Sequence, residues 1–240
     1  MNILEFVPSC LLVVLLGVLI RRRALVTLPG FFAYAAFAVA ADIARFLTHG
    51  NQRTYYPTYW ITEAVYDLLG ILVMYEVLRT VLGSLTRAWW ARLIFPAVLV
   101  LGIGMSIVRA NVVPSRLSGL EFYIAVGEIA VRFVQVFVFA GLVTLVPVVG
   151  LRWRQYPFGI STGFGLYATV MLLTTTKFSD FGTRFKLLWG WTSVVAYFLA
   201  VLIWIWFFSV PQKAENPSPE RSALSPVDLK QYKDALRRMR

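Results

Sequence analysis

Seven stretches of the chain are made mainly of apolar residues, and each is close to the length of a helix that crosses a lipid bilayer. Such a helix needs about 20 mostly apolar residues. The stretches cover residues 3–20, 29–48, 58–82, 93–109, 120–149, 158–177 and 186–210. The segments between them are short, so consecutive helices are expected to run antiparallel. The pattern predicts an all-α fold, a polytopic integral membrane protein built as a bundle of seven transmembrane helices.

The composition supports a lipid environment. Of the 240 residues, 59% are hydrophobic and 15% are charged, and the mean hydropathy is +0.70. A soluble domain carries about 45–50% apolar and about 25% charged residues. The first expected partner is therefore the lipid bilayer. The chain is expected to cross a membrane several times.

The net charge of +11 is distributed as in a membrane protein rather than as in a nucleic-acid-binding protein. Residues 21–23 are three arginines that directly follow the first apolar stretch. Lys and Arg in short loops are retained on the cytoplasmic side of a membrane. Later loops predicted on that side contain Arg87, Arg92, Arg152 and Arg154. We therefore expect no nucleic-acid partner, an N-terminus outside the cell and a C-terminus in the cytoplasm.

The chain is expected to divide into a transmembrane domain, residues 1–210, and a cytoplasmic tail, residues 211–240. The tail begins with a Pro/Ser-rich linker and ends in a short helical pattern that starts at Ser225, a favourable N-cap residue. One face of this pattern is apolar and the rest is basic, which is typical of helices that lie on anionic lipids. The alternative is a disordered, solubilising tail.

Ionisable residues interrupt three of the apolar stretches. They are Asp42 and Arg45 in the second, Glu63 and Asp67 in the third, and Glu128 and Arg132 in the fifth. Charged side chains inside a membrane are costly and usually face the protein interior. Counted along the helices, all six lie in the predicted outer half of the bundle. We predict a polar cavity open to the outside, in which these six residues bind a ligand.

A purely structural role is the alternative for part of this set. Asp42 with Arg45, and Glu128 with Arg132, have the spacing of ion pairs on one helix. Glu63 and Asp67 share a face of their helix but have no such partner on it, so they are the stronger functional candidates. Farther along the same stretch, Glu76 and Arg79 are expected to form a separate structural pair near the inner end.

Several chemistries are disfavoured by the residue content. Cys10 is the only cysteine and His49 the only histidine, so an intrachain disulfide is excluded and a zinc hydrolase lacks its usual ligands. No glycine-rich phosphate loop is present in the sequence. A retinal protein needs a lysine deep in its last helix, whereas the last apolar stretch has its only lysine, Lys186, at its start. We expect no catalytic residues, no metal and no cofactor.

The stretch TEAVYDLLGILVMYEVLR at residues 62–79, the YPFG entry at residues 156–159 and the Arg-rich inner loops resemble uncharacterised bacterial seven-helix inner-membrane proteins. The layout is also similar to the seven-helix sensor modules that precede some bacterial histidine kinases. This resemblance implies an inner-membrane location and signalling through a partner membrane protein.

Three functions are compatible with these features. The leading hypothesis is a non-enzymatic, receptor-like or accessory module that binds a small ligand, an ion or a partner from the outer side. The alternative is a secondary transporter that uses Glu63 and Asp67 as proton or cation sites, and a third hypothesis is a lipid-modifying membrane enzyme. Internal symmetry between helices one to three and five to seven would favour the transporter. A sealed cytoplasmic half would favour the receptor.

Overall fold

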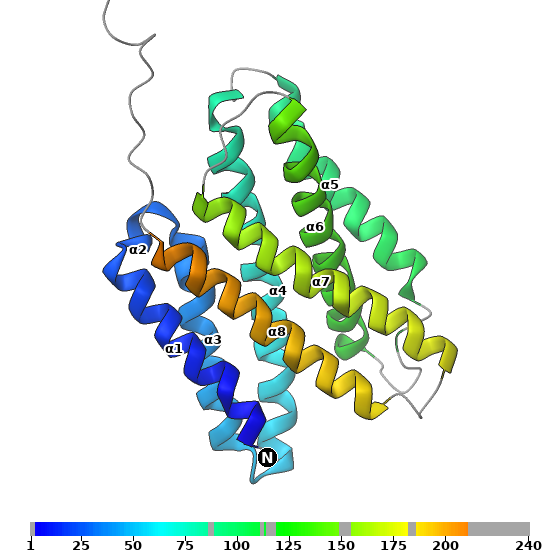
Figure 1. Ribbon diagram of the computed structural model, residues 1–240. Helices are drawn as coiled ribbons and strands as arrows, with labels where there is room; N and C mark the ends of the chain where they lie inside the picture. The colour runs from blue at the N-terminus through cyan, green and yellow to red at the C-terminus, as the bar shows by residue number, and fades with distance from the viewer. Residues whose placement is uncertain are drawn as a thin grey trace, which may run out of the picture. The chain divides into compact units, whose positions relative to one another are not determined.

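A computed structural model of the protein describes residues 3–85, 89–110, 113, 119–148, 155–181 and 186–210 (Figure 1). These residues form α-helices with short connections, and no strand occurs among them, so the predicted all-α fold is confirmed. The helices are α1 (Ile3–Arg21), α2 (Ala24–Thr27), α3 (Pro29–Thr48), α4 (Gln52–Val81), α5 (Trp89–Val108), α6 (Leu120–Val148), α7 (Gln155–Phe181) and α8 (Lys186–Ser209), with a 3-10 turn, η1 (Leu82–Leu85), after α4.

Membrane character is confirmed for part of the bundle. Within the described ranges, four helical segments are long and apolar enough to span a bilayer: Pro29–Thr48, Leu120–Val148, Gln155–Thr174 and Trp191–Ser209. Shorter apolar helical segments are Pro8–Arg21 and Arg92–Val108. The 30-residue helix α4 carries Glu63, Asp67, Glu76 and Arg79, which lower its hydropathy. Seven crossings, the orientation and the inner-membrane location stay predictions.

Some sequence-based predictions fall on residues that the structure does not describe. The cytoplasmic loop cations Arg87, Arg152 and Arg154 lie outside the described residues. The whole tail, residues 211–240, lies outside them as well, so its predicted helix and lipid contact stay predictions.

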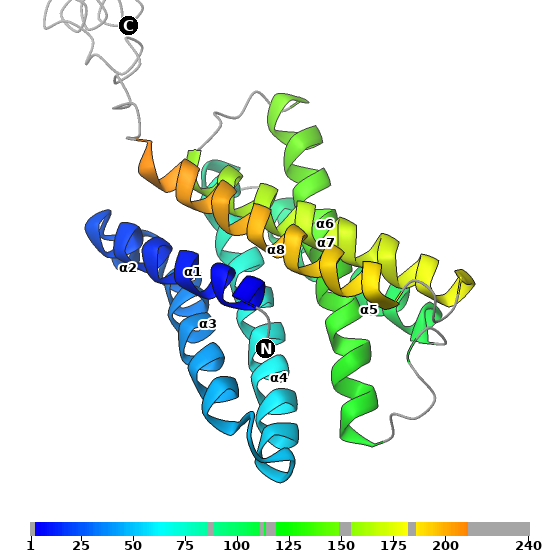
Figure 2. The same cartoon turned by 60° about the horizontal axis from the view of Figure 1, so that its bottom comes forward.

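Six of the long helices form a closed ring. Going round it, α1 packs against α3, α3 against α4, α4 against α6, α6 against α7, α7 against α8, and α8 against α1. Helix α5 packs against α6 and lies outside the ring, as both views show (Figures 1 and 2). The interior of the ring is therefore bounded by two groups of three helices, with α5 between them in sequence but not in space.

One end of the ring is filled by four aromatic side chains, which we call the aromatic cluster: Phe31, Phe164, Trp204 and Phe208. Each is at most 1% exposed. The ring of Phe31 stacks on Phe208 at 5.5 Å and meets Trp204 edge-on at 5.3 Å between centroids. Such aromatic pairs contribute about 0.5–1.5 kcal/mol each beyond the burial of their area. The cluster joins α3, α7 and α8 at the end where α3 and α7 begin and α8 ends.

Two glycines allow α7 and α8 to approach closely at this end. A Cβ added to Gly163 would lie 2.2 Å from Nε1 of Trp204, and one added to Gly159 would lie 2.4 Å from Cγ of Phe207. Their spacing of four places both on one face of α7, as in close helix pairs within membranes. The indole of Trp204 donates a hydrogen bond to the carbonyl of Ile160 at 3.3 Å. Larger residues at either glycine would push the two helices apart.

Polar side chains bind the helix termini at the same end. Arg22 donates to the carbonyls of Phe208 and Ser209, and so binds the free carbonyls at the end of α8. At the start of α3, the carboxylate of Glu76 accepts hydrogen bonds from the backbone N–H groups of Gly30 (3.0 Å) and Phe31 (2.9 Å).

The contact of Glu76 corrects one prediction. Glu76 does not pair with Arg79: within the described residues its carboxylate binds the N-terminus of α3 instead. The physical reason is that a helix N-terminus offers unpaired N–H groups and a partial positive charge, both of which favour a carboxylate. Glu76 thus connects α4 to α3, and the end of the ring that holds the aromatic cluster is tied together by polar as well as apolar contacts.

Candidate ligand-binding cavity

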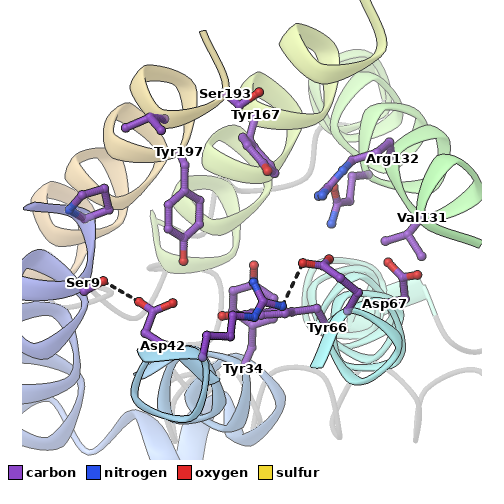
Figure 3. Close-up of a pocket in the computed structure, with 15 residues that line it drawn as sticks. Ser9, Tyr34, Asp42, Tyr66, Asp67, Val131, Arg132, Tyr167, Ser193 and Tyr197 are labelled. Carbon is purple, nitrogen blue, oxygen red and sulfur yellow. Dashed lines mark hydrogen bonds and ion pairs between the residues drawn. The ribbon is translucent and has the colours of Figure 1, made fainter. Parts of the chain in front are cut away.

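A cavity of about 290 Å³ lies inside the ring, on the far side of Tyr34 from the aromatic cluster. Every helix of the ring contributes to its wall (Figure 3). The lining residues are Pro8 and Ser9 from α1, Tyr34, Asp42 and Arg45 from α3, Glu63, Tyr66 and Asp67 from α4, Val131, Arg132 and Gln135 from α6, Tyr167 from α7, and Ser193, Val194 and Tyr197 from α8.

Five of the six residues predicted to bind a ligand line this cavity, and the sixth, Glu128, contacts it through Arg132. Separate helices therefore bring Asp42, Arg45, Glu63, Asp67 and Arg132 together in one space. Their role in binding stays a prediction, but the spatial cluster on which that role depends is present.

Arg45 connects α3 to α4. Its guanidinium forms an ion pair with Glu63 at 2.8 Å and donates from Nε to the hydroxyl of Thr62 at 2.9 Å. The same guanidinium lies over the rings of Tyr59 and Tyr66, 4.9 and 5.6 Å from their centroids. The side chains of Arg45 and Glu63 are only 22% and 17% exposed. A charge so enclosed needs its counter-charge, so this pair holds the wall of the cavity in place.

The predicted same-helix pair of Asp42 with Arg45 is wrong. Asp42 accepts a hydrogen bond from the hydroxyl of Ser9 on α1, with 2.6 Å between the oxygens. Arg45 turns to α4, where both Glu63 and Thr62 accept from its guanidinium, while Asp42 is already bound by Ser9. Each of the two residues therefore ties α3 to a different neighbour.

The predicted same-helix pair of Glu128 with Arg132 is confirmed, with 2.9 Å between Oε1 and a terminal guanidinium nitrogen. Arg132 also lies over the ring of Tyr167, 4.5 Å from the centroid, so that a cation–π contact joins α6 to α7. The Nε atom of Arg132 is buried and has no hydrogen-bond partner in the described part of the chain. The guanidinium is therefore fixed by one carboxylate and one aromatic face.

Asp67 differs from the other carboxylates of the cavity. Among the described residues it forms no hydrogen bond and no ion pair, although it is only partly exposed. Its Oδ2 atom faces Gly127 of α6, where an added Cβ would come within 3.5 Å. Figure 3 shows its carboxylate beside Val131 at the edge of the cavity. Glu63 and Asp67 therefore differ: Glu63 forms an ion pair with Arg45, and Asp67 forms no ion pair among the described residues.

Gln135 is a second polar group without a full set of partners. It is 1% exposed, lines the cavity, and its Oε1 atom has no hydrogen-bond partner among the described residues. A buried amide oxygen without a partner costs about 1–3 kcal/mol, so it marks a place where a donor is missing. Gln135 follows Arg132 by three residues on one face of α6, but it is not among the six residues predicted from the sequence.

The aromatic part of the cavity was missed at the sequence level. Four tyrosines line it: Tyr34, Tyr66, Tyr167 and Tyr197. In Figure 3, Tyr167 and Tyr197 point from α7 and α8 into the space between Asp42 and Arg132. The only signal that could have found them is that a tyrosine hydroxyl within an apolar stretch also needs a polar environment.

Comparisons with family models, with curated proteins and with solved structures give no match to this chain. The resemblance to seven-helix inner-membrane proteins and to sensor modules therefore stays an expectation, and the assignment of a function depends on the geometry of the cavity.

Proposed function

We propose that the protein is a non-enzymatic, receptor-like or accessory membrane module, which binds a small polar ligand in the cavity from the outer side of the cell inner membrane. One observation carries this proposal: the same ring of helices is hollow and polar around Asp67 and Arg132, and is filled by aromatic side chains at its other end. A ligand can enter such a ring and bind, but within the described residues the aromatic cluster separates the cavity from the other end.

The wall of the cavity supports a binding role. Both arginines are held in place, Arg45 by Glu63 and Thr62, and Arg132 by Glu128 and the Tyr167 ring. Polar groups that are already fixed lose little freedom when a ligand arrives, which favours affinity. Since all six helices of the ring contribute side chains, a ligand would contact each of them and could change their packing. In this proposal that change is passed to a partner membrane protein.

A labelling experiment tests the proposal. Single cysteines replace Val194 in the cavity and Ala200 in the closed half, both on α8, in a full-length Cys10→Ser background. Val194 lines the cavity, and Ala200 is 0% exposed. An impermeant maleimide is applied to intact cells and to inverted membrane vesicles, with Thr86→Cys as a marker for the cytoplasmic side.

We expect Val194→Cys to react only from outside, Thr86→Cys only from inside, and Ala200→Cys from neither side. A reaction of Val194→Cys from the cytoplasmic side in sealed inverted vesicles would contradict a receptor closed on that side. A reaction of Thr86→Cys in intact cells would contradict the seven-crossing topology with its N-terminus outside.

One observation favours the transporter as a second candidate. Within each half of the ring the helices follow one another in chain order: α1, α3 and α4 in the first half, and α6, α7 and α8 in the second. Helix α5 connects the two halves in sequence and lies outside the ring. Two three-helix halves joined by a linker helix would give this order, and related halves are a common basis of alternating access. Alternating access would expose Val194→Cys to the reagent from both sides, so the same labelling experiment separates the two functions.

A further inference from the structure

We infer that the ligand of the cavity is a small organic ammonium ion, whose N–H groups bind the carboxylate of Asp67 and the Oε1 atom of Gln135. This inference rests on the proposed function and names the chemical class of its ligand. It depends on the charge balance of the cavity, on the two acceptors without partners, and on the aromatic wall.

The charge balance of the cavity favours a cation. Three carboxylates and two guanidinium groups line it, and Glu128 binds one of the guanidinium groups from outside the lining set. Glu63 and Glu128 neutralise Arg45 and Arg132, one each. Asp42 and Asp67 are left without a cationic partner among the described residues. An enclosed carboxylate without a counter-charge attracts a cationic group. Asp42 accepts a hydrogen bond from Ser9, whereas Asp67 has no donor among the described residues, so Asp67 is the stronger site for a cation.

The two acceptors without partners lie on facing helices. Asp67 lies opposite Gly127 of α6, and Gln135 lies against Gly70 of α4, where an added Cβ would be 3.4 Å from its Nε2 atom. Gly70 follows Asp67 by three residues, which is about one helical turn. Neither glycine has a side chain that could cover the polar group opposite it. Helices α4 and α6 therefore present a carboxylate and an amide oxygen to the same cavity, and both need N–H donors.

A primary ammonium group fits this pair of acceptors better than a quaternary amine. A primary ammonium carries three N–H donors and no acceptor, so it can bind the carboxylate and the amide oxygen at once. A quaternary ammonium has no N–H group and would leave Oε1 of Gln135 without a partner. Hydrogen bonds between an ionised donor and a carboxylate are also about twice as strong as those between neutral groups.

The tyrosines supply the rest of the site. Tyr34 and Tyr197 line the cavity, and no arginine of the described residues lies over either ring, whereas Arg45 and Arg132 lie over Tyr66 and Tyr167. Their rings can contact the carbon atoms next to an ammonium, which carry part of its positive charge. The cavity volume of about 290 Å³ limits the ligand to a small amine.

Thermal unfolding of the purified full chain in detergent tests this inference. The probes are butylammonium chloride, tetramethylammonium chloride, sodium butyrate, 1-butanol and sodium chloride, at matched ionic strength for the salts. We expect butylammonium alone to raise the melting temperature with a saturable dependence on concentration. Asp67→Asn and Gln135→Leu should each weaken its apparent affinity roughly tenfold or more, because each removes an acceptor bound to a charged donor. Glu76→Gln is the matched control, since it changes a carboxylate at the other end of α4 and should leave the affinity unchanged.

The outcomes separate this inference from the proposed function. Equal stabilisation by tetramethylammonium or by sodium chloride would overturn it, and so would an affinity for butylammonium that Asp67→Asn leaves unchanged. Stabilisation by butyrate or 1-butanol but not by butylammonium would overturn the ammonium ligand. If the cavity-filling variant Val194→Trp then loses that stabilisation, the result would still support a binding cavity. If no probe raises the melting temperature, the inference fails, and labelling of Val194→Cys decides independently whether the cavity opens to the outer side.

Discussion

The two ends of the six-helix ring use the same helices but fill the space between them differently. At one end, Phe31, Phe164 and Trp204 from three helices meet and exclude space. About three turns farther along α3, Asp42 and Arg45 face a cavity instead. The first end is closed by aromatic packing, and the second is held open by polar groups that bind each other across the wall.

This difference shows what each kind of contact can do in a bundle. Aromatic rings fill space and pack without leaving groups that need a partner, so they close the ring. Ion pairs such as Arg45 with Glu63 fix the distance between two helices without filling the interior. A polar interior of this size can hold water or a ligand, whereas an apolar one would stay empty and cost stability.

The largest effect is expected for Glu63→Gln. It leaves the enclosed guanidinium of Arg45 without its counter-charge, which should lower the free energy of unfolding by about 3 kcal/mol. Asp42→Asn is the matched control in the same cavity, because asparagine can still accept from Ser9, and it should lower stability far less. Thermal or denaturant unfolding in detergent measures both. Equal losses in the two variants would contradict the assignment of Glu63 as the structural carboxylate.

In the closed half, Gly163→Ala should cost about 1–3 kcal/mol, because the new methyl group would overlap the indole of Trp204 and force the helices apart. Gly141→Ala on α6 is the control: no atom lies within 4 Å of its added Cβ, so it should be neutral or slightly stabilising. The same unfolding assay compares them. If Gly163→Ala is tolerated as well as Gly141→Ala, close packing of α7 on α8 does not hold the closed end together.

Glu76→Ala should destabilise the protein by about 1 kcal/mol, because the first N–H groups of α3 lose the carboxylate that caps them. Arg79→Ala removes an exposed cation one turn later and should change stability by less than about 0.5 kcal/mol. Hydrogen exchange of the Gly30 and Phe31 amides would locate the effect, since their protection should fall in the first variant only. Similar losses in both variants would instead support the same-helix pair of Glu76 with Arg79.

The helices and part of the site could be predicted from the sequence, for a physical reason. Long apolar stretches and the four-residue spacing of Glu128 and Arg132 are local features, and the helices and this one pair follow from them. The predicted pairs of Asp42 with Arg45 and of Glu76 with Arg79 fail, because each carboxylate has a partner on another helix. The partner of Arg45 could not be predicted, because Glu63 reaches it only when α3 packs on α4.

The aromatic residues show the same limit. Trp204 in the closed end and Tyr197 in the cavity lie seven residues apart on α8, and both stand among apolar residues in the sequence. Nothing local distinguishes a ring that packs from one that lines a cavity. The role of Glu76 likewise could not be predicted, because its carboxylate accepts hydrogen bonds from the first N–H groups of another helix, α3.

The most direct test of the account is the unfolding of Asp67→Asn without ligand, measured beside Glu63→Gln. Asp67 forms no hydrogen bond or ion pair among the described residues, so we expect its charge to contribute little to the wall that Glu63 stabilises. We expect Asp67→Asn to keep the stability of the unmodified protein within about 0.5 kcal/mol, or to raise it. A loss as large as that of Glu63→Gln would show that Asp67 holds the bundle together, and would contradict its assignment as the carboxylate that binds a ligand.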